Sequence, residues 1–378
     1  MLYLNTVPLF YILILIVAMR MRAFVFSRHC CEGVRMIQTD QPVLASNDRK
    51  HVLVKVHYCG VNPVDAKYCI GDKLPKWLTG IGRWGMENRG VGFDFSGVVV
   101  DIPQQDSSIP YAKGDAVFGV MPPTLGSFRD YVLAPMDQLY CKPKGIELRE
   151  AAVLPLSGLT GLQALRYDYR QVAGNIILII GASGGVGHFV TQIAKIMGLK
   201  IVAVCSRKNH QFALRNGADF AVDYRQGIAK MSDQLSDILF KIEGNNAKFN
   251  MVFDCVSSIE EKDKEYDYVG WISESDFLDK DGVHVTIGGS SMDWVRAGLK
   301  RSIGLNLFGK NNELFWVRFP NCSPFLKELS ENFIDNDLNF QLKPRIAAEL
   351  PFSEKGVRDA FQYMHQRRTV GKVVLKVD

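Results

Sequence analysis

The chain has 378 residues, which is enough for two compact domains and too many for one ordinary hydrophobic core. Hydrophobic residues make up 47% and charged residues 22%, the balance of a globular protein rather than of a disordered or fibrous one. The formal net charge of +5 is spread along the chain without a long run of like charges, which argues against nucleic-acid binding.

The chain contains eight cysteines, and none of them forms a C-x-x-C pair or stands near a histidine cluster. Several lie inside apolar runs, as Cys205 does in residues 201–205, where a thiol behaves as a small hydrophobic group. This usage is typical of reduced structural cysteines. It predicts a reducing compartment, either the cytoplasm or an organelle such as the mitochondrion.

The N-terminal segment is apolar: residues 1–19 carry no charge, and residues 9–19 form an unbroken apolar run. A membrane span needs about 20 apolar residues, and Pro8 interrupts the candidate. A secretory signal is not indicated, because the segment lacks a positive n-region and a small-residue cleavage site. Two readings stay open for residues 1–20: a membrane anchor, or a dispensable extension upstream of a start at Met21.

Residues 21–156 are predicted to form a mostly β domain. Residues 21–26 and 51–58 alternate apolar and polar side chains, as half-buried strands do. Gly-Asp pairs mark turns within the segment. This domain ends just before a helix predicted over residues 157–166, with which the next domain begins.

Residues 157–341 have the pattern of a doubly wound sheet. Residues 175–180 form an expected strand in which every residue after Asn175 is apolar, as in a strand buried on both faces. They run into a glycine-rich turn at residues 181–187 (GASGGVG) and then into a helical stretch. This order of strand, glycine turn and helix, followed by another strand, is the βαβ unit. The further elements expected here are strands at residues 200–205, 249–256 and 283–287 and a helix at residues 226–242.

The last segment, residues 342–378, contains a predicted helix over residues 357–365 and a closing strand over residues 372–377. That strand is expected to return to the sheet of the first domain. The charged residues 257–280 are interpreted as a surface loop. The predicted fold class is α/β, with a doubly wound parallel Rossmann sheet beside a mostly β domain.

The glycine-rich turn predicts a dinucleotide site. Glycines permit a tight turn from strand to helix and let the backbone approach a diphosphate closely. The helix that follows offers free N–H donors and a positive dipole end to that anion. The spacing G-x-x-G-x-x-G differs from the commoner G-x-G-x-x-G, so the prediction depends on the position between a buried strand and a helix.

The end of the second strand indicates which dinucleotide is bound. An NAD site usually has an acidic residue there for the ribose 2′-hydroxyl. Here the chain continues into Ser206, Arg207 and Lys208, with no carboxylate. A hydroxyl followed by two cations suits a 2′-phosphate, to which Tyr224 could add a phenol. The sequence therefore predicts NADPH, and the alternative is that Arg207 and Lys208 form a solvated surface pair.

Six segments resemble, in order, the signatures of the quinone oxidoreductases. They are residues 60–67 (GVNPVDAK), 92–97 (GFDFSG), 114–119 (GDAVFG), 126–131 (GSFRDY), 154–160 (LPLSGLT) and 371–375 (GKVVL). The resemblance identifies the chain with the zinc-independent quinone-oxidoreductase and enone-reductase branch of the medium-chain dehydrogenase/reductase superfamily. Plant enone reductases and the reticulon-interacting mitochondrial oxidoreductases are both similar, and the choice between them stays open.

The resemblance implies a domain organisation. Residues 21–156 would form a GroES-like catalytic domain and residues 157–341 an NADPH-binding Rossmann domain. Residues 342–378 would return to the catalytic domain.

The resemblance also implies roles for individual residues. Asn62 matches an asparagine near the nicotinamide and Lys67 a lysine that faces the substrate carbonyl, so both are candidate catalytic residues. Asn62 could instead brace the turn before Pro63, and Lys67 could be an ordinary surface lysine. The other implied positions concern the cofactor: Thr160 at the nicotinamide, Ser183, Gly184, Gly185 and Val186 at the diphosphate, Ser206, Arg207 and Tyr224 at the 2′-phosphate, Cys255 and Ile287 along the cofactor groove, and Lys372 near the cofactor.

Zinc is not expected. Zinc-dependent relatives have a cysteine where Asn62 stands and Gly-His-Glu where residues 92–94 (GFD) stand. Zinc binds three or four N, S or O ligands in tetrahedral array, which these positions do not supply.

The sequence therefore predicts hydride transfer from NADPH to a small-molecule quinone or α,β-unsaturated carbonyl compound. Without zinc, a donor or cation must meet the charge that develops on the carbonyl oxygen, and Lys67 is the candidate. Two alternatives stay open: a non-catalytic NADPH-binding protein with a structural or regulatory role, and a membrane-associated partner protein that depends on residues 1–19. A homodimer also stays open.

Overall fold

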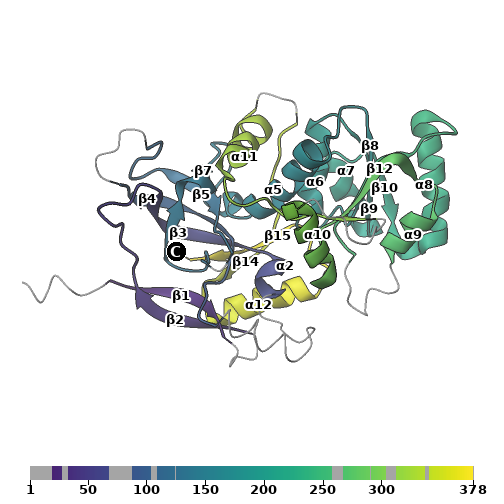
Figure 1. Cartoon of the computed structure of the whole chain (residues 1–378). Helices are drawn as coiled ribbons and strands as arrows, with labels where there is room; N and C mark the ends of the chain where they lie inside the picture. The colour runs from purple at the N-terminus through teal and green to yellow at the C-terminus, as the bar shows by residue number, and fades with distance from the viewer. Residues whose placement is uncertain are drawn as a thin grey trace, which may run out of the picture.

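The computed structural model describes residues 19–27, 33–67, 87–103, 109–123, 125–257, 267–289, 291–303, 312–336 and 340–377. Figure 1 shows these residues arranged around two sheets that lie side by side. Residues 1–18, on which both readings of the N-terminal segment depend, lie outside the described residues. Within the described ranges, no helix combines the length and the apolar character that a membrane crossing requires.

The first sheet is mostly antiparallel and joins strands from both ends of the chain. Its order is β14-β15-β3-β4-β5-β7, and β6 pairs with β3 as well. A two-stranded sheet of β1 and β2 accompanies it (Figure 1). The strands are β1 (Arg20–Phe26), β2 (Val34–Asp40), β3 (His51–Val61), β4 (Asp94–Asp101), β5 (Ala116–Val120), β6 (Tyr131–Pro135), β7 (Leu139–Cys141), β14 (Ile346–Pro351) and β15 (Lys372–Lys376).

The second sheet has six parallel strands in the order β10-β9-β8-β11-β12-β13, which confirms the predicted Rossmann sheet and the α/β fold class. The strands are β8 (Ile176–Ile180), β9 (Lys200–Cys205), β10 (Phe220–Asp223), β11 (Phe249–Asp254), β12 (Leu278–Thr286) and β13 (Glu313–Leu314). The helices of this part are α6 (Gly187–Ile196), α7 (His210–Arg215), α8 (Ile228–Glu243), α9 (Tyr268–Glu274) and α10 (Ser291–Ile303).

Further helices and helical turns connect and cover the sheets. They are α2 (Pro63–Lys67), α4 (Leu148–Ala151), α5 (Pro155–Leu162), α11 (Ser323–Glu328) and α12 (Glu354–His365), the π-helical segments η3 (Gln163–Asp168) and η7 (Leu329–Ile334), and the 3₁₀ turns η2 (Met136–Gln138), η4 (Arg207–Asn209) and η5 (Tyr224–Gln226).

Strand β8 explains why the sequence is continuously apolar here. All five of its side chains are buried, and they alternate between two hydrophobic clusters. Ile177 and Ile179 pack into a cluster that also contains Phe118 of β5 and Phe189 of α6. The two sheets therefore share one core, and the position of the glycine turn after β8 is fixed relative to the first sheet.

The interpretation of residues 257–280 as a surface loop was wrong for its second half. Helix α9 begins at Tyr268, and the carboxylate of Asp267 accepts a hydrogen bond from the backbone N–H of Gly270 (2.9 Å) at its start. Tyr268 and Ile272 are buried one helical turn apart. The charged residues of the segment hid this short apolar repeat, while residues 258–266 lie outside the described ranges.

The C-terminal strand β15 lies between β14 and β3. Its residue Val373 pairs with Val61 at the end of β3, so Lys372 lies beside the point where Asn62 follows that strand. The backbone N–H of the preceding Gly371 donates to the carbonyl of Ser183 in the glycine turn (3.0 Å). The start of β15 therefore connects the first sheet to the glycine turn of the second.

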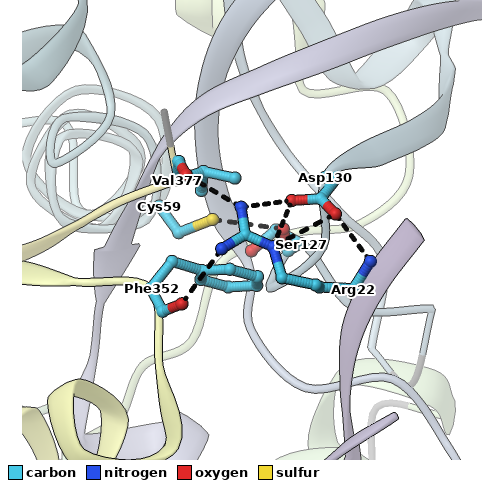
Figure 2. A network of polar contacts seen from close by, with 6 residues as sticks. All are labelled: Arg22, Cys59, Ser127, Asp130, Phe352 and Val377. Carbon is cyan, nitrogen blue, oxygen red and sulfur yellow. Dashed lines mark hydrogen bonds and ion pairs between the residues drawn. The ribbon is translucent and has the colours of Figure 1, made fainter. Parts of the chain in front are cut away.

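Arg22 of β1 joins the N-terminal hairpin to the C-terminal segments, as Figure 2 shows. Its guanidinium forms an ion pair with Asp130 (2.8 Å) and donates to the carbonyls of Phe352 (3.4 Å) and Val377 (3.0 Å). The guanidinium also lies 5.2 Å from the centroid of the Phe352 ring. Four segments that are distant in sequence thus meet at one side chain.

Replacing Arg22 tests this junction. We expect Arg22→Met to lower the free energy of unfolding by about 1.5–3 kcal/mol, the contribution of one well-formed hydrogen bond to a charged group, because the guanidinium is 30% exposed and water weakens its several bonds. The matched control is Arg20→Met on the same strand, since the Arg20–Asp40 ion pair is 62% and 64% exposed and such pairs contribute about 0–1 kcal/mol. Chemical denaturation measures both, and equal losses would contradict this account.

Candidate active site

The candidate cofactor residues lie along one edge of the parallel sheet. Neighbouring strands end in register there, because Ile180 pairs with Val204 on one side and with Asp254 on the other. The carboxyl ends of parallel strands on both sides of the point where the strand order reverses form the usual ligand site of such sheets. The predicted residues follow directly after these ends: Ser183–Val186 after β8, Ser206 and Arg207 after β9, Tyr224 after β10, Cys255 after β11 and Ile287 after β12.

The glycine turn after β8 has the geometry that its sequence predicts. Gly181 has a φ of +82°, and a Cβ on Gly187 would lie 2.2 Å from the carbonyl oxygen of Gly181. Side chains are therefore excluded at both positions. Within the described part of the chain, no group accepts a hydrogen bond from the backbone N–H of Gly185 or of Val186. With the N-terminus of α6 directly behind them, these donors can receive an anion such as a diphosphate.

The turn after β9 is connected to the glycine turn. Ser206 is buried, and Arg207 and Lys208 are exposed. The side-chain amide of Asn209 donates to the hydroxyl of Ser183 (3.1 Å), so the two turns are held together. Two exposed cations at this end of β9 agree with a phosphate-binding role, although exposure alone also agrees with the surface-pair alternative.

The turn after β10 contains an aromatic ring and a further cation. Tyr224 is partly buried, and the guanidinium of Arg225 lies 5.8 Å from the centroid of its ring. Asp223, which ends β10, accepts a hydrogen bond from the backbone N–H of Arg225 (3.1 Å) and is itself buried. Sequence reasoning missed Arg225, although its place next to Tyr224 was a usable signal.

Asn62, Lys372 and Asp94 form a buried polar cluster, which we call the Asn62 cluster. The ammonium of Lys372 donates to the amide oxygen of Asn62, and the amide nitrogen of Asn62 donates to Asp94 Oδ2 (2.9 Å). Lys372 Nζ lies 3.6 Å from the same carboxylate oxygen. Asn62 and Asp65 together brace the turn before α2: the Asp65 carboxylate accepts from the backbone N–H of Asn62 (2.7 Å), and the backbone N–H of Asp65 donates to the carbonyl of Asn62 (3.0 Å).

Burial dominates the titration of this cluster. It raises the pKa of Asp65 to about 8 and raises the pKa of Asp94, while the nearby Lys372 ammonium acts in the opposite direction on both. Burial also lowers the pKa of Lys372, and the two carboxylates oppose that shift. The cluster is therefore a set of groups whose charges depend on one another.

Three further predicted residues are Thr160, Cys255 and Lys67. Thr160 is buried on α5 and donates its hydroxyl to the carbonyl of Leu156 (2.7 Å). Burial raises the pKa of the Cys255 thiol well above its ordinary value, so Cys255 is a neutral lining group rather than a nucleophile. Lys67 ends α2, five residues after Asn62, and its side chain lies outside what the structure describes.

His188 is a site residue that sequence reasoning missed. It lies in the first turn of α6, where Nδ1 donates to the carbonyl of Gly184 (2.8 Å) and Nε2 accepts from the backbone N–H of Arg345 (3.3 Å). Its neighbour Gln192 exchanges hydrogen bonds with the backbone of Lys343. The glycine turn is thus fastened to the chain that leads into β14. A histidine directly after the last glycine of the turn was the available signal.

His188 predicts a pH dependence of stability. Burial, followed by the charge of Lys372, lowers its pKa from 6.5 to about 4, whereas the unfolded chain takes up a proton near pH 6.5. The unfolded state therefore binds more protons between these values. We expect the free energy of unfolding to fall by about 3 kcal/mol as the pH drops from about 6.5 to about 4, with no further loss from this residue below pH 4.

Denaturation across this pH range checks the prediction. His188→Gln should lose this part of the pH dependence, because glutamine does not titrate. The control His365→Gln, which changes an exposed histidine at the end of α12, should keep the slope of the parent. The same slope in all three proteins would contradict the assignment.

Two protein-family models match the chain, one in each domain. The family model of the alcohol dehydrogenase GroES-like domain matches residues 48–144, and that of the zinc-binding dehydrogenases matches residues 185–270. Within the described residues, no group of three or more His, Cys, Asp or Glu side chains is arranged to hold a metal ion.

Several similar proteins are named as oxidoreductases. The quinone oxidoreductase of Sus scrofa is 35% identical over 195 residues, which are 51% of this chain and 55% of that protein, so the match spans about half of the relative's length. The mitochondrial NAD(P)H oxidoreductase RTN4IP1 of Mus musculus is 28% identical over 346 residues, 86% of this chain and 81% of that protein. The solved CurK enoyl reductase has the same fold, with a TM-score of 0.70 and 21% identity over 95% of this chain and 99% of that one. The chain therefore belongs to the medium-chain dehydrogenase/reductase superfamily of oxidoreductases, among relatives that include quinone oxidoreductases and enoyl reductases.

Proposed function

We propose that this protein transfers a hydride from NADPH to a quinone or an α,β-unsaturated carbonyl compound without zinc. The observation that carries the proposal is the edge of the parallel sheet, where candidate cofactor residues follow five strand ends and the glycine turn among them lies next to Lys372 of the other sheet. A Cβ on Gly185 would lie only 3.1 Å from Cδ of Lys372, so a ligand at the glycine turn lies next to the Asn62 cluster. The names of the relatives support the two substrate classes.

Each part of the cofactor has a proposed partner along this edge. The N–H groups of Gly185 and Val186, with Ser183 and Gly184, would hold the diphosphate. Arg207 would bind the 2′-phosphate with Ser206 and Tyr224, since no carboxylate follows β9. Thr160, Asn62, Cys255, Ile287 and Lys372 would line the path toward the nicotinamide.

The chemistry then requires little of the protein beyond position and polarisation. Bound NADPH supplies the hydride. Lys67 would place its ammonium beside the substrate carbonyl and stabilise the negative charge that develops on the oxygen. Asn62 would orient the nicotinamide, and its own orientation is set by the groups around it.

We propose that the site binds no zinc, because the side chains at the positions of the zinc ligands are unsuited to it. The position of the zinc-binding cysteine is Asn62, whose amide is hydrogen-bonded to Asp94 and to the Lys372 ammonium. An ammonium 3.6 Å from the carboxylate already supplies its counter-charge and would repel a divalent cation there. Phe93, at the histidine position, is buried and contributes no ligand atom.

The test of the function is NADPH oxidation by the whole chain against a panel of quinones and enones, in the presence of a metal chelator. We expect turnover with at least one acceptor and no loss of rate in chelator. NADPH binding without turnover on any acceptor would support the non-catalytic alternative instead. Activity lost together with one tightly bound zinc per chain would overturn the zinc-free assignment.

Lys67→Met separates catalysis from binding in the same assay. An ammonium that acts on developing charge stabilises mainly the transition state, so its removal should lower kcat much more than it weakens NADPH binding. The loss should approach about a hundredfold if the site excludes water. Turnover equal to that of the parent would make Lys67 an ordinary surface lysine.

Arg207→Ala tests the cofactor preference. We expect the parent to bind NADPH more tightly than NADH, and the variant to lose about tenfold to a hundredfold in NADPH affinity, since charge-assisted hydrogen bonds to phosphate contribute about 1.5–3 kcal/mol. NADH affinity should change little, because NADH presents only a hydroxyl there. Direct titration of both cofactors measures this.

The matched control for that titration is Arg215→Ala, which removes an exposed arginine of α7 away from the strand ends. It should leave both affinities unchanged. Equal affinity of the parent for NADH and NADPH would refute the NADPH assignment. Equal losses of both cofactors in Arg207→Ala would refute the role of Arg207.

A further inference from the structure

Asp94 is a buried carboxylate to which the sequence analysis gave no role. It is the first residue of β4 and has no solvent exposure. Its Oδ1 accepts from the backbone N–H of Leu156 at the start of α5 (2.8 Å), and its Oδ2 accepts from Asn62 (2.9 Å). The Lys372 ammonium is 3.6 Å from the same Oδ2. One carboxylate therefore contacts β15, α5 and the residue after β3.

These contacts allow the Asn62 amide only one orientation. Its oxygen faces the Lys372 ammonium and its nitrogen faces the Asp94 carboxylate. A flipped amide would direct its N–H groups at the ammonium and its oxygen at the carboxylate, and both contacts would be repulsive. Asp94 uses one of the two amide N–H donors and thereby fixes the direction of the other.

The orientation of the Asn62 amide depends on the charges of both Lys372 and Asp94. Lys372 and Asp94 are both fully buried, and an ion pair that loses one partner leaves an uncompensated charge away from water. Asp65 is close enough to oppose, together with Asp94, the lowering of the Lys372 pKa by burial, so it belongs to the same set of interacting charges. Removing the Asp94 charge should therefore disturb both Lys372 and Asn62.

We propose that Asp94 is a positioning residue, which fixes the Asn62 amide and the Lys372 ammonium in the geometry that the bound nicotinamide requires. This inference rests on the proposed NADPH-dependent function. Asp94 acts through Asn62 and Lys372, not by contact with substrate. Because Lys372 also lies next to Gly185, the same carboxylate links the diphosphate end of the site to its catalytic end.

The first test compares Asp94→Asn with Ser96→Ala. Both remove a buried polar function from β4, but Ser96 donates to the carbonyl of Leu148 (2.6 Å), away from the Asn62 cluster. We expect Asp94→Asn to lower kcat by about tenfold to a hundredfold, because small displacements of reacting groups have effects of this size. The dissociation constant of NADPH should change little. Ser96→Ala should leave kcat unchanged.

The primary isotope effect on kcat, measured with NADPH deuterated at the transferred position, separates positioning from stability. Asp94→Asn should raise it, because hydride transfer becomes rate-limiting, whereas a merely structural role would not change it. If the kcat and the isotope effect of Asp94→Asn equal those of Ser96→Ala, the proposal is overturned.

A second test needs neither substrate nor cofactor. Lys372→Met and Asp94→Asn should each lower the unfolding temperature, and the double variant should lose less than the sum of the two, because it leaves no unpaired charge between these residues. Additive losses would overturn the coupling on which the proposal depends. Since this cycle does not use turnover, it decides the coupling even if the parent turns over no acceptor, an outcome that would refute the proposed function alone.

Discussion

The buried ammonium of Lys372 is the constraint on which the arrangement of the site depends. A charge removed from water must be surrounded by counter-charge and by hydrogen-bond acceptors. The strand pairing supplies them: β15 pairs with the end of β3, which Asn62 follows, and β4 pairs with the same end through Asp94. Three segments that are far apart in sequence are therefore held together by one charge balance. The glycine turn joins them through the hydrogen bond between Gly371 and Ser183.

The parallel sheet contributes a different kind of order. Its central strand β8 is buried on both faces, so the turn that follows it cannot shift without disturbing the shared core. His188 fastens that turn to the chain before β14, and Asn209 fastens it to the turn after β9. The proposed diphosphate and 2′-phosphate positions are thus fixed before any ligand binds. Preorganised donors of this kind spend little free energy on rearrangement when an anion arrives.

The sequence predicted those features that depend on local pattern. Continuous apolar runs located the parallel strands, and the glycine spacing located the turn, because both are set by neighbouring residues. It did not predict features that depend on pairing between distant segments. Asp94 sits 278 positions before Lys372 in the chain, and nothing local marks it as the counter-ion. Helix α9 was missed because charged neighbours obscured its two buried residues. The role of Lys67 rests on the resemblance alone, since its side chain lies outside the described residues.

The central claim is that NADPH lies along the strand ends of the parallel sheet, between the glycine turn and the turn after β9. Hydrogen–deuterium exchange of the whole chain with and without saturating NADPH tests it most directly. The account predicts slower exchange in residues 181–187 and 206–209 when NADPH is bound, and unchanged exchange in residues 51–56 of β3. Protection confined to other segments, with residues 181–187 unchanged at saturation, would contradict it.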